Sequence, residues 1–380
     1  MMELLTVGQK VLKTLNEAGY EAYFVGGMVR DQLLGRPIYD IDITTSAKPD
    51  VVMSLFEKTI ATGLAHGTVT VMIDRFPIEV TTFRVETGYS DYRHPNEVHF
   101  TSSLEEDLKR RDFTINAIAQ DRKGYLYDPI QGLVDLKARC LKCVGEPVQR
   151  FTEDPLRILR GIRFVSKLGF ALEIKTLEGM KQVSGLIENI SKERVKKELE
   201  GIIQGEFRQE AMYYLYDVQV LNKLSGLNTL SHYQGYDFKL LTHPILLFTL
   251  ASLQLEEPAA YLASWPFSRE ERRCISVLSA SIAEQTPMPY FLYRYKEEWA
   301  QLYYQLICFL YQENKPYESI TLPIQSRKDL AVNVATITKL IDRPKGPWIQ
   351  QLLEEIEYHI VMNQLVNEKN TLIEFIKMHR

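Results

Sequence analysis

The sequence predicts a multidomain protein in which a small α/β domain with a mixed sheet is followed by an all-α region. In the first 145 or so residues, short runs rich in β-branched and aromatic residues alternate with helical patterns. From about residue 152 to the end, apolar residues recur at helical spacing, interrupted only by short polar breaks. A length of 380 residues leaves room for roughly two to four domains.

Each element of the α/β part has a local signal. Residues 7–18 repeat apolar residues at helical spacing, and residues 29–34 form a helical turn that Gly35 closes. Residues 104–119 are also expected to be helical, whereas residues 84–98 are polar and aromatic without a period, which predicts a loop. Short β-prone or alternating runs predict strands at residues 21–25, 40–44, 69–73, 78–83, 125–128 and 139–144.

Composition restricts the class of protein. The formal net charge of -4 argues against a polycation that coats nucleic acid, although residues 101–200 carry 19 Lys/Arg against 16 Asp/Glu. Cys140 and Cys143 read as small buried thiols on a strand, in preference to half of a zinc site. The start lacks the apolar core of a signal peptide, and no run of about 18 apolar residues occurs. We therefore expect a cytoplasmic protein with no membrane contact.

The first cluster with chemical potential joins a glycine pair to two aspartates. Gly26 and Gly27 follow a predicted strand, and Asp40 and Asp42 lie on the next one. Residues two apart in a strand point to the same side, so the carboxylates lie about 6–7 Å apart. This suits Mg²⁺, two ions of which can clamp a phosphoryl transfer, while the glycines let backbone N–H groups approach a triphosphate. Glu79 is a candidate third carboxylate or simply an exposed strand residue.

Two further groups of charged residues suit a nucleotide. Arg30 can bind phosphate oxygens with two hydrogen bonds, and Asp31 is expected to pair with a nearby arginine or to cap the turn. Arg111 and Asp112 follow two other cations. Arg111 could contact phosphate and Asp112 a ribose 2′-hydroxyl, which would favour ribonucleotides. The alternative is the capped start of a solvent-exposed helix.

The third cluster begins the helical region. Thr152 is a plausible N-cap, with Pro155 in the first turn. Asp154 is followed along one helix face by three arginines, Arg157, Arg160 and Arg163. A surface ion pair between Asp154 and Arg157 would contribute at most ~1 kcal/mol. As a recognition pair, however, Asp154 accepts and Arg157 donates, which matches the amino group and ring nitrogen of adenine or cytosine and mismatches guanine and uracil.

These clusters, in this order, resemble the class II tRNA nucleotidyltransferase family, the bacterial CCA-adding enzymes and their poly(A) polymerase relatives. The match covers roughly half of the chain, about residues 20–200. Its motifs are residues 24–36 (FVGGMVRDQLLGR), 39–45 (YDIDITT), 66–71 (HGTVTV), 79–86 (EVTTFRVE), 110–117 (RRDFTINA) and 153–170 (EDPLRILRGIRFVSKLGF).

The resemblance implies a role for each cluster. Asp40 and Asp42 match the metal-binding carboxylates, and Gly27 and Arg30 match contacts to the triphosphate. Arg111 and Asp112 match the RRD motif that contacts nucleotide phosphate and sugar. The motif that selects ATP and CTP, together with the arginines that follow it, is matched by Glu153, Asp154, Arg157, Arg160 and Arg163.

The resemblance also implies an architecture of four parts. We expect a catalytic nucleotidyltransferase head at residues 1–147, a nucleotide-templating neck at 148–205, a helical body at 206–290 and a tRNA-binding tail at 291–380. The expected substrates are ATP, CTP and the tRNA acceptor end, and nothing in the sequence indicates a protein partner.

Residues 84–96 look like the family's flexible loop, with Arg84, Asp91 and Arg93 as candidate loop residues. Because the loop is complete, the resemblance favours full CCA addition. CC-adding, A-adding and poly(A) enzymes remain alternatives, as do a small-molecule nucleotidyltransferase and a non-catalytic RNA-binding relative. Residues 191–199 (SKERVKKEL) are either an RNA contact or a solvated helix face, and we favour the solvated face.

Overall fold

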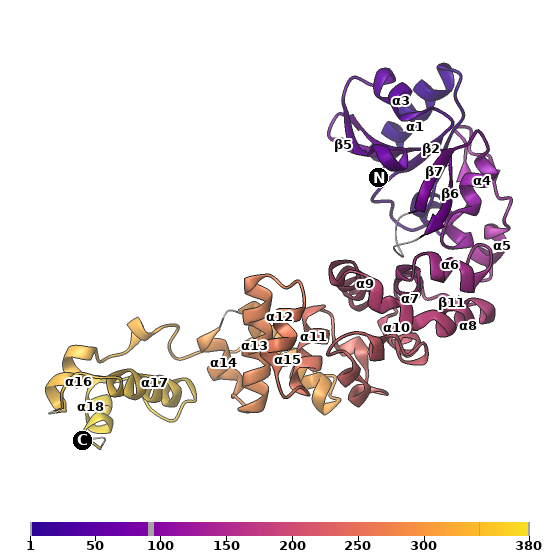
Figure 1. The fold of residues 1–380 in the computed structure, drawn as a ribbon. Coiled ribbons are helices and arrows are strands. Elements are labelled where there is room, and N and C mark those ends of the chain that lie inside the picture. The colour runs from indigo at the N-terminus through magenta and orange to yellow at the C-terminus, as the bar shows by residue number, and fades with distance from the viewer. Residues whose placement is uncertain (1, 90–94, 296, 342, 379–380) are drawn as a thin grey trace. The chain divides into compact units, whose positions relative to one another are not determined.

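The computed structural model describes residues 2–89, 95–295, 297–341 and 343–378 (Figure 1). The chain divides into two compact units, Met1–Ser231 and His232–Arg380. The first unit contains the α/β domain and the helices that follow it, and the second is built from helices. Across the described ranges, no helix is long and apolar enough to cross a membrane.

A seven-stranded sheet forms the centre of the α/β domain, in the order β3-β4-β5-β2-β1-β8-β9. Strands β2 and β5 run parallel and the other neighbours run antiparallel, so the sheet is mixed, as predicted. The strands are β1 (Ala22–Val25), β2 (Asp42–Thr45), β3 (Thr59–Gly63), β4 (Thr68–Ile73), β5 (Phe76–Thr82), β8 (Ala119–Gln120) and β9 (Leu126–Tyr127). Of these, β3 and β8 were not predicted from the sequence.

Helices pack on both faces of this sheet. On one face, Phe24 of β1 lies against Gly8, where an added Cβ would come within 2.7 Å of the Phe24 ring. On the other face, Thr44 donates a hydrogen bond to Asp107, at 3.1 Å. Asp42 lies two residues before Thr44 and shares its face. The helices of the α/β domain are α1 (Met2–Glu17), α2 (Gly27–Leu33), α3 (Pro49–Leu55), α4 (Leu104–Lys109) and α5 (Gly132–Lys137).

The prediction of a loop at residues 84–98 is wrong at both ends of that range. These residues form an antiparallel hairpin of β6 (Arg84–Tyr89) and β7 (Pro95–Phe100), outside the central sheet. Its ladder of backbone hydrogen bonds needs no buried apolar face, and both His99 and Phe100 are exposed. Val98 lies opposite Glu86 and Phe100 opposite Arg84, so apolar and charged residues share one side of the hairpin and no apolar face marks it.

The predicted helix at residues 104–119 is interrupted at the RRD motif. Helix α4 ends at Lys109, and a 3₁₀ turn follows only at Thr114–Asn116. Between them, Val144 donates its backbone N–H to Asp112 and Thr114 donates to Lys142, at 3.1 and 2.9 Å. The fully buried ring of Phe113 anchors this extended segment. Pairing with residues 142–144 thus outweighs the helical pattern.

The start of the next helices also differs from expectation. Thr152 lies within helix α6, and Pro155 occupies the N-cap of helix α7. Asp154 therefore stands in the break between two helices, not in the first turn of one. The remaining elements of this unit are α6 (Pro147–Glu153), α7 (Leu156–Leu168), α8 (Ile174–Val183), α9 (Lys192–Gln204), α10 (Arg208–Asp217), and the short parallel pair β10 (Cys140–Leu141) and β11 (Ala171–Leu172).

The two closely spaced cysteines are accounted for by packing. Cys140 is half-buried in β10, Cys143 is buried, and both thiols are free. Burial raises the pKa of Cys143 to about 12. In the part of the chain that the structure describes, no group of three or more His, Cys, Asp or Glu side chains could hold a metal ion. The buried-thiol interpretation of Cys143 is confirmed.

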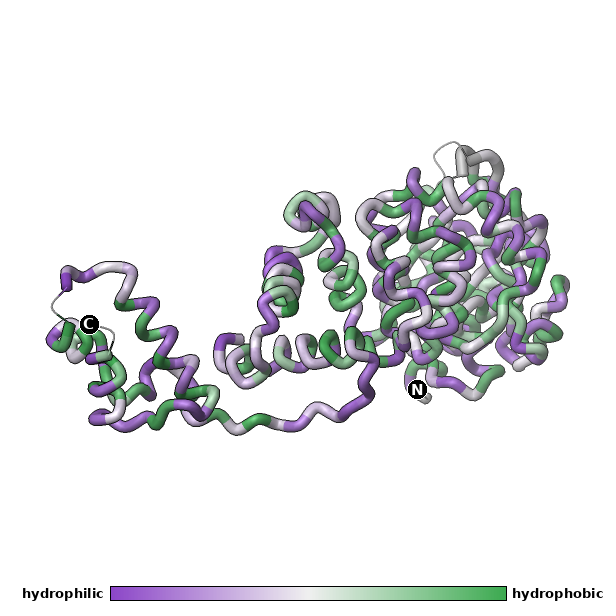
Figure 2. Tube along the Cα trace, turned by 90° about the horizontal axis from the view of Figure 1, so that it is seen from below, coloured by the Kyte–Doolittle hydropathy of each residue, from purple (hydrophilic) through white to green (hydrophobic). Residues whose placement is uncertain are grey.

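The second unit buries apolar faces of its own helices. Figure 2 shows hydrophobic and hydrophilic residues alternating along these helices. In the C-terminal group, Ile337, Ile356 and Leu372 are fully buried in one cluster. The helices are α11 (Ile245–Leu253), α12 (Pro258–Ser264), α13 (Arg269–Ala283), α14 (Met288–Arg294), α15 (Glu297–Tyr311), α16 (Val334–Leu340), α17 (Trp348–Val361) and α18 (Lys369–Met378).

Candidate active site

Carboxylates gather at one end of strand β2. Asp42 is the first residue of the strand, Asp40 lies just before it and is exposed, and Glu79 of β5 is the direct register partner of Asp42. Neighbouring strands lie about 4.8 Å apart, so Asp42 and Glu79 are adjacent on one face. The structure therefore brings Glu79 beside the predicted pair.

The electrostatics of this cluster favour a bound cation. Burial, together with the nearby charges of Asp40 and Glu79, raises the pKa of Asp42 to about 6, against an opposing effect of Arg111. A divalent cation would relieve this repulsion, and carboxylate oxygens are the ligands that Mg²⁺ prefers. The three carboxylates are not arranged as a closed metal site. Among the described residues, no group of three His, Cys, Asp or Glu side chains is close enough together to hold an ion.

The glycine pair contributes through Gly26. Gly26 has a positive φ of 70°, and a Cβ there would lie 3.3 Å from Asp42 Oδ2 and 3.5 Å from Arg111 Nη1. A side chain at this position would therefore crowd both charged groups. At Gly27 the nearest atom to an added Cβ is Arg30 Nη2, at an ordinary 3.5 Å. The sequence contained both glycines, but only the structure shows that Gly26 lies between Asp42 and Arg111.

Arg30 is held inside the protein. Its guanidinium donates to Asp31 and Asn116, at 2.8 and 2.6 Å, and lies over the ring of Phe164 at 5.2 Å. Its side chain is only 3% exposed. The expected pairing of Asp31 with an arginine is confirmed, and Lys167 adds a longer contact to Asp31 at 3.5 Å.

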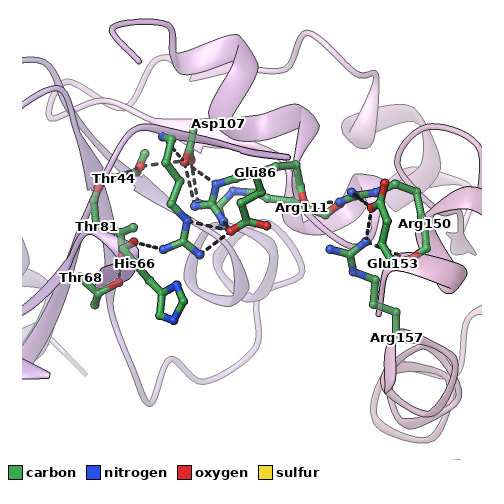
Figure 3. Close-up of polar contacts among 12 residues, drawn as sticks. Thr44, His66, Thr68, Thr81, Glu86, Asp107, Arg111, Arg150, Glu153 and Arg157 are labelled. Carbon is green, nitrogen blue, oxygen red and sulfur yellow. Dashed lines mark hydrogen bonds and ion pairs between the residues drawn. The ribbon is translucent and has the colours of Figure 1, made fainter. Parts of the chain in front are cut away.

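Asp107 organises the RRD motif, as Figure 3 shows. This fully buried carboxylate pairs with Arg110 at 2.8 Å and Arg111 at 3.3 Å, and Thr44 of β2 donates to it. Burial alone would raise the pKa of Asp107, but the two arginines outweigh burial and lower it. Sequence reasoning missed Asp107, because it follows Glu105 and Glu106 in the acidic first turn of a helix, where such residues are common.

Asp112 is held by helix α7. It accepts two hydrogen bonds from Arg160, at 2.6 and 3.0 Å, and one from Asn116 at 3.1 Å. Burial would raise the pKa of Asp112, but Arg160, Asn116 and the backbone N–H of Phe113 hold it well below its usual range. Two residues predicted to bind nucleotide, Asp112 and Arg160, thus bind each other in the structure.

The segment expected to select bases is connected to the RRD motif through Arg150 (Figure 3). Arg150 donates to the backbone carbonyls of Arg110 and Arg111 and pairs with Glu153. Glu153 also pairs with Arg157 at 3.2 Å. Arg150 was not predicted from the sequence, and its position shows how the end of α6 is attached to the head.

Asp154 and Arg163 both form ion pairs with residues of helix α9. Asp154 pairs with Arg194 at 3.2 Å, and Arg163 pairs with Glu198 at 2.5 Å. Helix α9 carries the segment for which a solvated face was favoured over an RNA contact. That interpretation is wrong for its inner side, because Arg194 and Glu198 face helix α7 and Leu199 is fully buried.

The hairpin root is also part of the network. Arg84 of β6 donates to Glu86 at 2.8 Å and to the backbone carbonyl of His66, and its own N–H donates to Asp107 at 3.4 Å (Figure 3). Arg110 reaches Glu86 at 3.4 Å. The other two loop candidates, Asp91 and Arg93, lie outside the described residues.

Comparison with known proteins gives three matches to family descriptions along this chain. Residues 22–142 match the poly A polymerase head domain. Residues 169–228 match the probable RNA and SrmB-binding site of polymerase A, and residues 244–376 match the putative tRNA nucleotidyltransferase domain 2. Together, these matches cover most of the chain.

Individual relatives extend the match to nearly the full length. The CCA-adding enzyme of Enterococcus faecalis is 37% identical over 385 residues, covering 97% of this chain and 95% of the relative. That of Listeria monocytogenes is 38% identical, with 97% of each covered. The crystal structure of the Bacillus stearothermophilus CCA-adding enzyme in complex with CTP is 32% identical, with a TM-score of 0.80 over 98% of this chain and 96% of that one. The Thermotoga maritima CCA-adding enzyme complexed with tRNA is 20% identical and shares the fold, with a TM-score of 0.69.

Proposed function

The chain belongs to the CCA-adding enzyme family, and on this premise we propose how its side chains divide the work of the reaction. The enzyme adds C, C and A to the 3′ end of tRNA, with CTP and ATP as substrates. In each step the 3′-hydroxyl oxygen forms a bond to the α-phosphorus. The bond from that phosphorus to the β-phosphate bridging oxygen breaks, and pyrophosphate leaves with the electron pair.

Asp40 and Asp42 are the proposed catalytic carboxylates and ligands of Mg²⁺, and Glu79 is a candidate third ligand. The observation that carries this assignment is the position of Asp42, with like charges beside it and Arg111 across Gly26. Members of this family generally depend on a metal, and we propose two Mg²⁺ ions here. Bound Mg²⁺ would supply charge neutralisation and ease deprotonation of the attacking hydroxyl.

Arginines around this centre are proposed to hold the triphosphate and ribose. Arg111 has an Nε that is buried without a hydrogen-bond partner, so its guanidinium retains capacity for a phosphate oxygen. Gly27, Arg30 and Asp112 complete the phosphate and sugar contacts in this assignment. Asp112 is bound to Arg160, so a ribose hydroxyl would either replace Arg160 on the Asp112 carboxylate or donate to that carboxylate beside Arg160.

Base choice is assigned to Asp154 and Arg157, supported by Glu153, Arg160 and Arg163. Asp154 offers an acceptor to the amino group of cytosine or adenine, and Arg157 offers a donor to the neighbouring ring nitrogen. Glu153 holds Arg157 at 3.2 Å. We propose that one site serves both nucleotides, because both present the same hydrogen-bond pattern.

The four-part division at residues 147, 205 and 290 also stays a proposal. It places the carboxylates in the head and the base-selecting residues in the neck. Within the unit Met1–Ser231, ion pairs such as Asp112–Arg160 join these two parts. The flexible-loop role of Arg84, Asp91 and Arg93 is proposed on the same basis.

A substitution that exchanges an acceptor for a donor tests the base-choice assignment. In Asp154→Asn, the amide NH₂ can donate to the uracil carbonyl, so we expect the ratio of kcat/KM for CTP over UTP to fall by roughly 10²-fold. Single-nucleotide incorporation into tRNA lacking its last three nucleotides measures this ratio. An unchanged ratio in a folded variant would rule out Asp154 as the base-reading acceptor.

A further inference from the structure

The ring of Phe164, on helix α7, is approached by three arginines that the proposed function assigns to the nucleotide. The guanidinium carbons of Arg30, Arg160 and Arg163 lie 5.2, 5.8 and 5.3 Å from the ring centroid. A cation within about 6 Å of a ring centroid is attracted by the electron-rich face of the ring. Arg30 belongs to helix α2 and the other two arginines to α7, so this one ring joins the two helices.

Phe164 is itself held in place. It is only 6% exposed. Its ring packs edge to face against that of Phe113, with the centroids 5.7 Å apart and the ring planes at 82°. Phe113 is fully buried and is bridged through its backbone to Cys143. The position of the Phe164 ring is therefore set by the protein itself, and the ring offers the arginines a rigid surface.

The hydrogen bonds of Arg30 show what the ring contributes. Arg30 Nε donates to Asp31 and Nη1 donates to Asn116. Among the described residues, Arg30 Nη2 makes no hydrogen bond, and a Cβ added at Gly27 would lie 3.5 Å from it. The unused donor thus lies beside the glycine assigned to the triphosphate. The Phe164 ring stabilises the guanidinium without an acceptor atom, so it leaves this donor to a phosphate oxygen.

Packing alone would not require an aromatic side chain at this position. Leucine or methionine could fill a similar volume, but neither attracts a cation. An acidic side chain would bind the arginines strongly, but it would compete with the phosphates for the same N–H donors. An aromatic ring attracts the cations and leaves their donors to the ligand.

We propose that Phe164 is a positioning residue for the triphosphate. Its ring holds the Arg30 guanidinium with Nη2 beside Gly27 and keeps it close to the two arginines of α7. This proposal rests on the proposed function of Arg30 and adds a residue that makes no polar contact with the nucleotide. Because CTP and ATP share the triphosphate, loss of the ring weakens both nucleotides equally and leaves base choice unchanged.

The test measures KM and kcat for CTP on tRNA lacking its last three nucleotides and for ATP on tRNA ending in CC. It also measures the inhibition constant of inorganic pyrophosphate, which carries neither base nor sugar. For Phe164→Leu, we expect both KM values and the pyrophosphate inhibition constant to rise together, roughly 5- to 10-fold. The ratio of kcat/KM for CTP over UTP should stay at the wild-type value. Phe164→Tyr keeps the ring and should recover most of the loss.

Phe207→Leu makes the same chemical change where no nucleotide contact is involved. Phe207 lies against Gly169, the C-cap of α7, where an added Cβ would meet three of its ring atoms at 2.8 Å. No arginine of the described residues lies over the Phe207 ring. Phe207→Leu should therefore lower the Tm without changing KM or pyrophosphate inhibition.

A second variant without a ring, Phe164→Met, serves if Phe164→Leu does not fold. The proposal is overturned if the folded variants without a ring keep wild-type KM and pyrophosphate inhibition. It is also overturned if Phe164→Tyr is impaired as severely as they are.

Arg30→Ala separates this proposal from the proposed function on which it rests. In the Arg30→Ala background, Phe164→Leu should raise the pyrophosphate inhibition constant little further, because the ring acts through the arginine. If Arg30→Ala alone leaves pyrophosphate inhibition unchanged, the assignment of Arg30 to the triphosphate fails. If Arg30→Ala weakens inhibition and Phe164→Leu does not, only the positioning role of Phe164 fails.

Discussion

Asp42 lies among carboxylates whose charges oppose its own, and this position defines its predicted role. Replacing Asp42 with Asn keeps the shape of the side chain and removes the charge that a divalent cation needs. We predict that Asp42→Asn lowers kcat for nucleotide addition roughly 10³-fold or more while tRNA binding persists. Rates of CTP addition and filter binding of labelled tRNA measure the two quantities.

Asp50 provides a matched control for this substitution. It is an exposed carboxylate on helix α3, away from the Asp42–Glu79 pair. Asp50→Asn should therefore retain wild-type kcat. A fully active Asp42→Asn protein would refute the assignment of Asp42 to the metal.

Asp112 gives a prediction about pH. Its pKa is lowered in the folded protein, so ionised Asp112 contributes stability above the pKa of about 4 that it has when unfolded, and this contribution is lost as the pH falls. At pH 7, Asp112→Asn should cost about 2 kcal/mol, less than a fully buried pair because the Arg160 side chain is 35% exposed. The cost should shrink as the pH falls below about 4.

Urea unfolding of wild type and Asp112→Asn at several pH values tests this sign. A difference in unfolding free energy that stays constant, or grows, between pH 7 and pH 3 would contradict the account. Asp121→Asn serves as a comparison, since Asp121 stands on an exposed turn where it accepts from backbone N–H groups. Its effect should be small at pH 7.

At the scale of elements, helix α7 owes its position to Gly161. A Cβ at this residue would lie 2.6 Å from Met180 Cε and 2.8 Å from the Phe113 ring. We predict that Gly161→Ala destabilises the protein by roughly 1–3 kcal/mol through overpacking. It should also raise KM for CTP, because Arg157 and Arg160 stand on the same helix.

Gly185 is the matched control for this prediction. It lies in the same compact unit, but an added Cβ would meet nothing within 4 Å. Gly185→Ala should therefore leave Tm and KM close to wild type. Thermal melts and steady-state kinetics of both variants give the comparison. If the two substitutions have equal effects, the close approach of α7 to Phe113 is not what positions the helix.

The sequence predicted the elements that alternate hydrophobic and polar residues, and it failed where backbone pairing acts alone. Strands β2, β4 and β5 were predicted to within two residues. The hairpin of β6 and β7 was not, because no hydrophobic face marks it. The break at residues 110–113 was missed because Phe113 is buried by pairing with a segment 30 residues away. Such pairing leaves no local pattern.

Prediction of the site from the sequence was limited in the same way, by contacts between residues that are far apart along the chain. The motif residues Asp42, Asp112 and Arg157 could be identified from their sequence context and a family resemblance. Their supports could not, because Asp107, Arg150 and Arg194 are ordinary charged residues on helices. What distinguishes them is the partner that each one meets, and that partner lies up to 40 residues away along the chain. Only the folded arrangement makes this visible.

At the scale of the whole molecule, the proposed chemistry lies in one unit and the second unit is helical. The net charge of -4 is low for a protein that must hold RNA over a long surface. Most of the cations assigned to the nucleotide lie within residues 101–200, namely Arg111, Arg157, Arg160 and Arg163. This distribution suits an enzyme that adds a few nucleotides to one RNA end and then releases it.

The length of the product is the most direct test of this account. Wild-type protein is incubated with tRNA that lacks its last three nucleotides, and the RNA is resolved at single-nucleotide resolution. We predict growth by two nucleotides with CTP alone and by three with CTP and ATP together, with no further extension. Arrest at two with both nucleotides would indicate a CC-adding enzyme, and addition only to tRNA already ending in CC an A-adding one. A long ladder with ATP alone would indicate a poly(A) polymerase, and any of these three results would contradict the account.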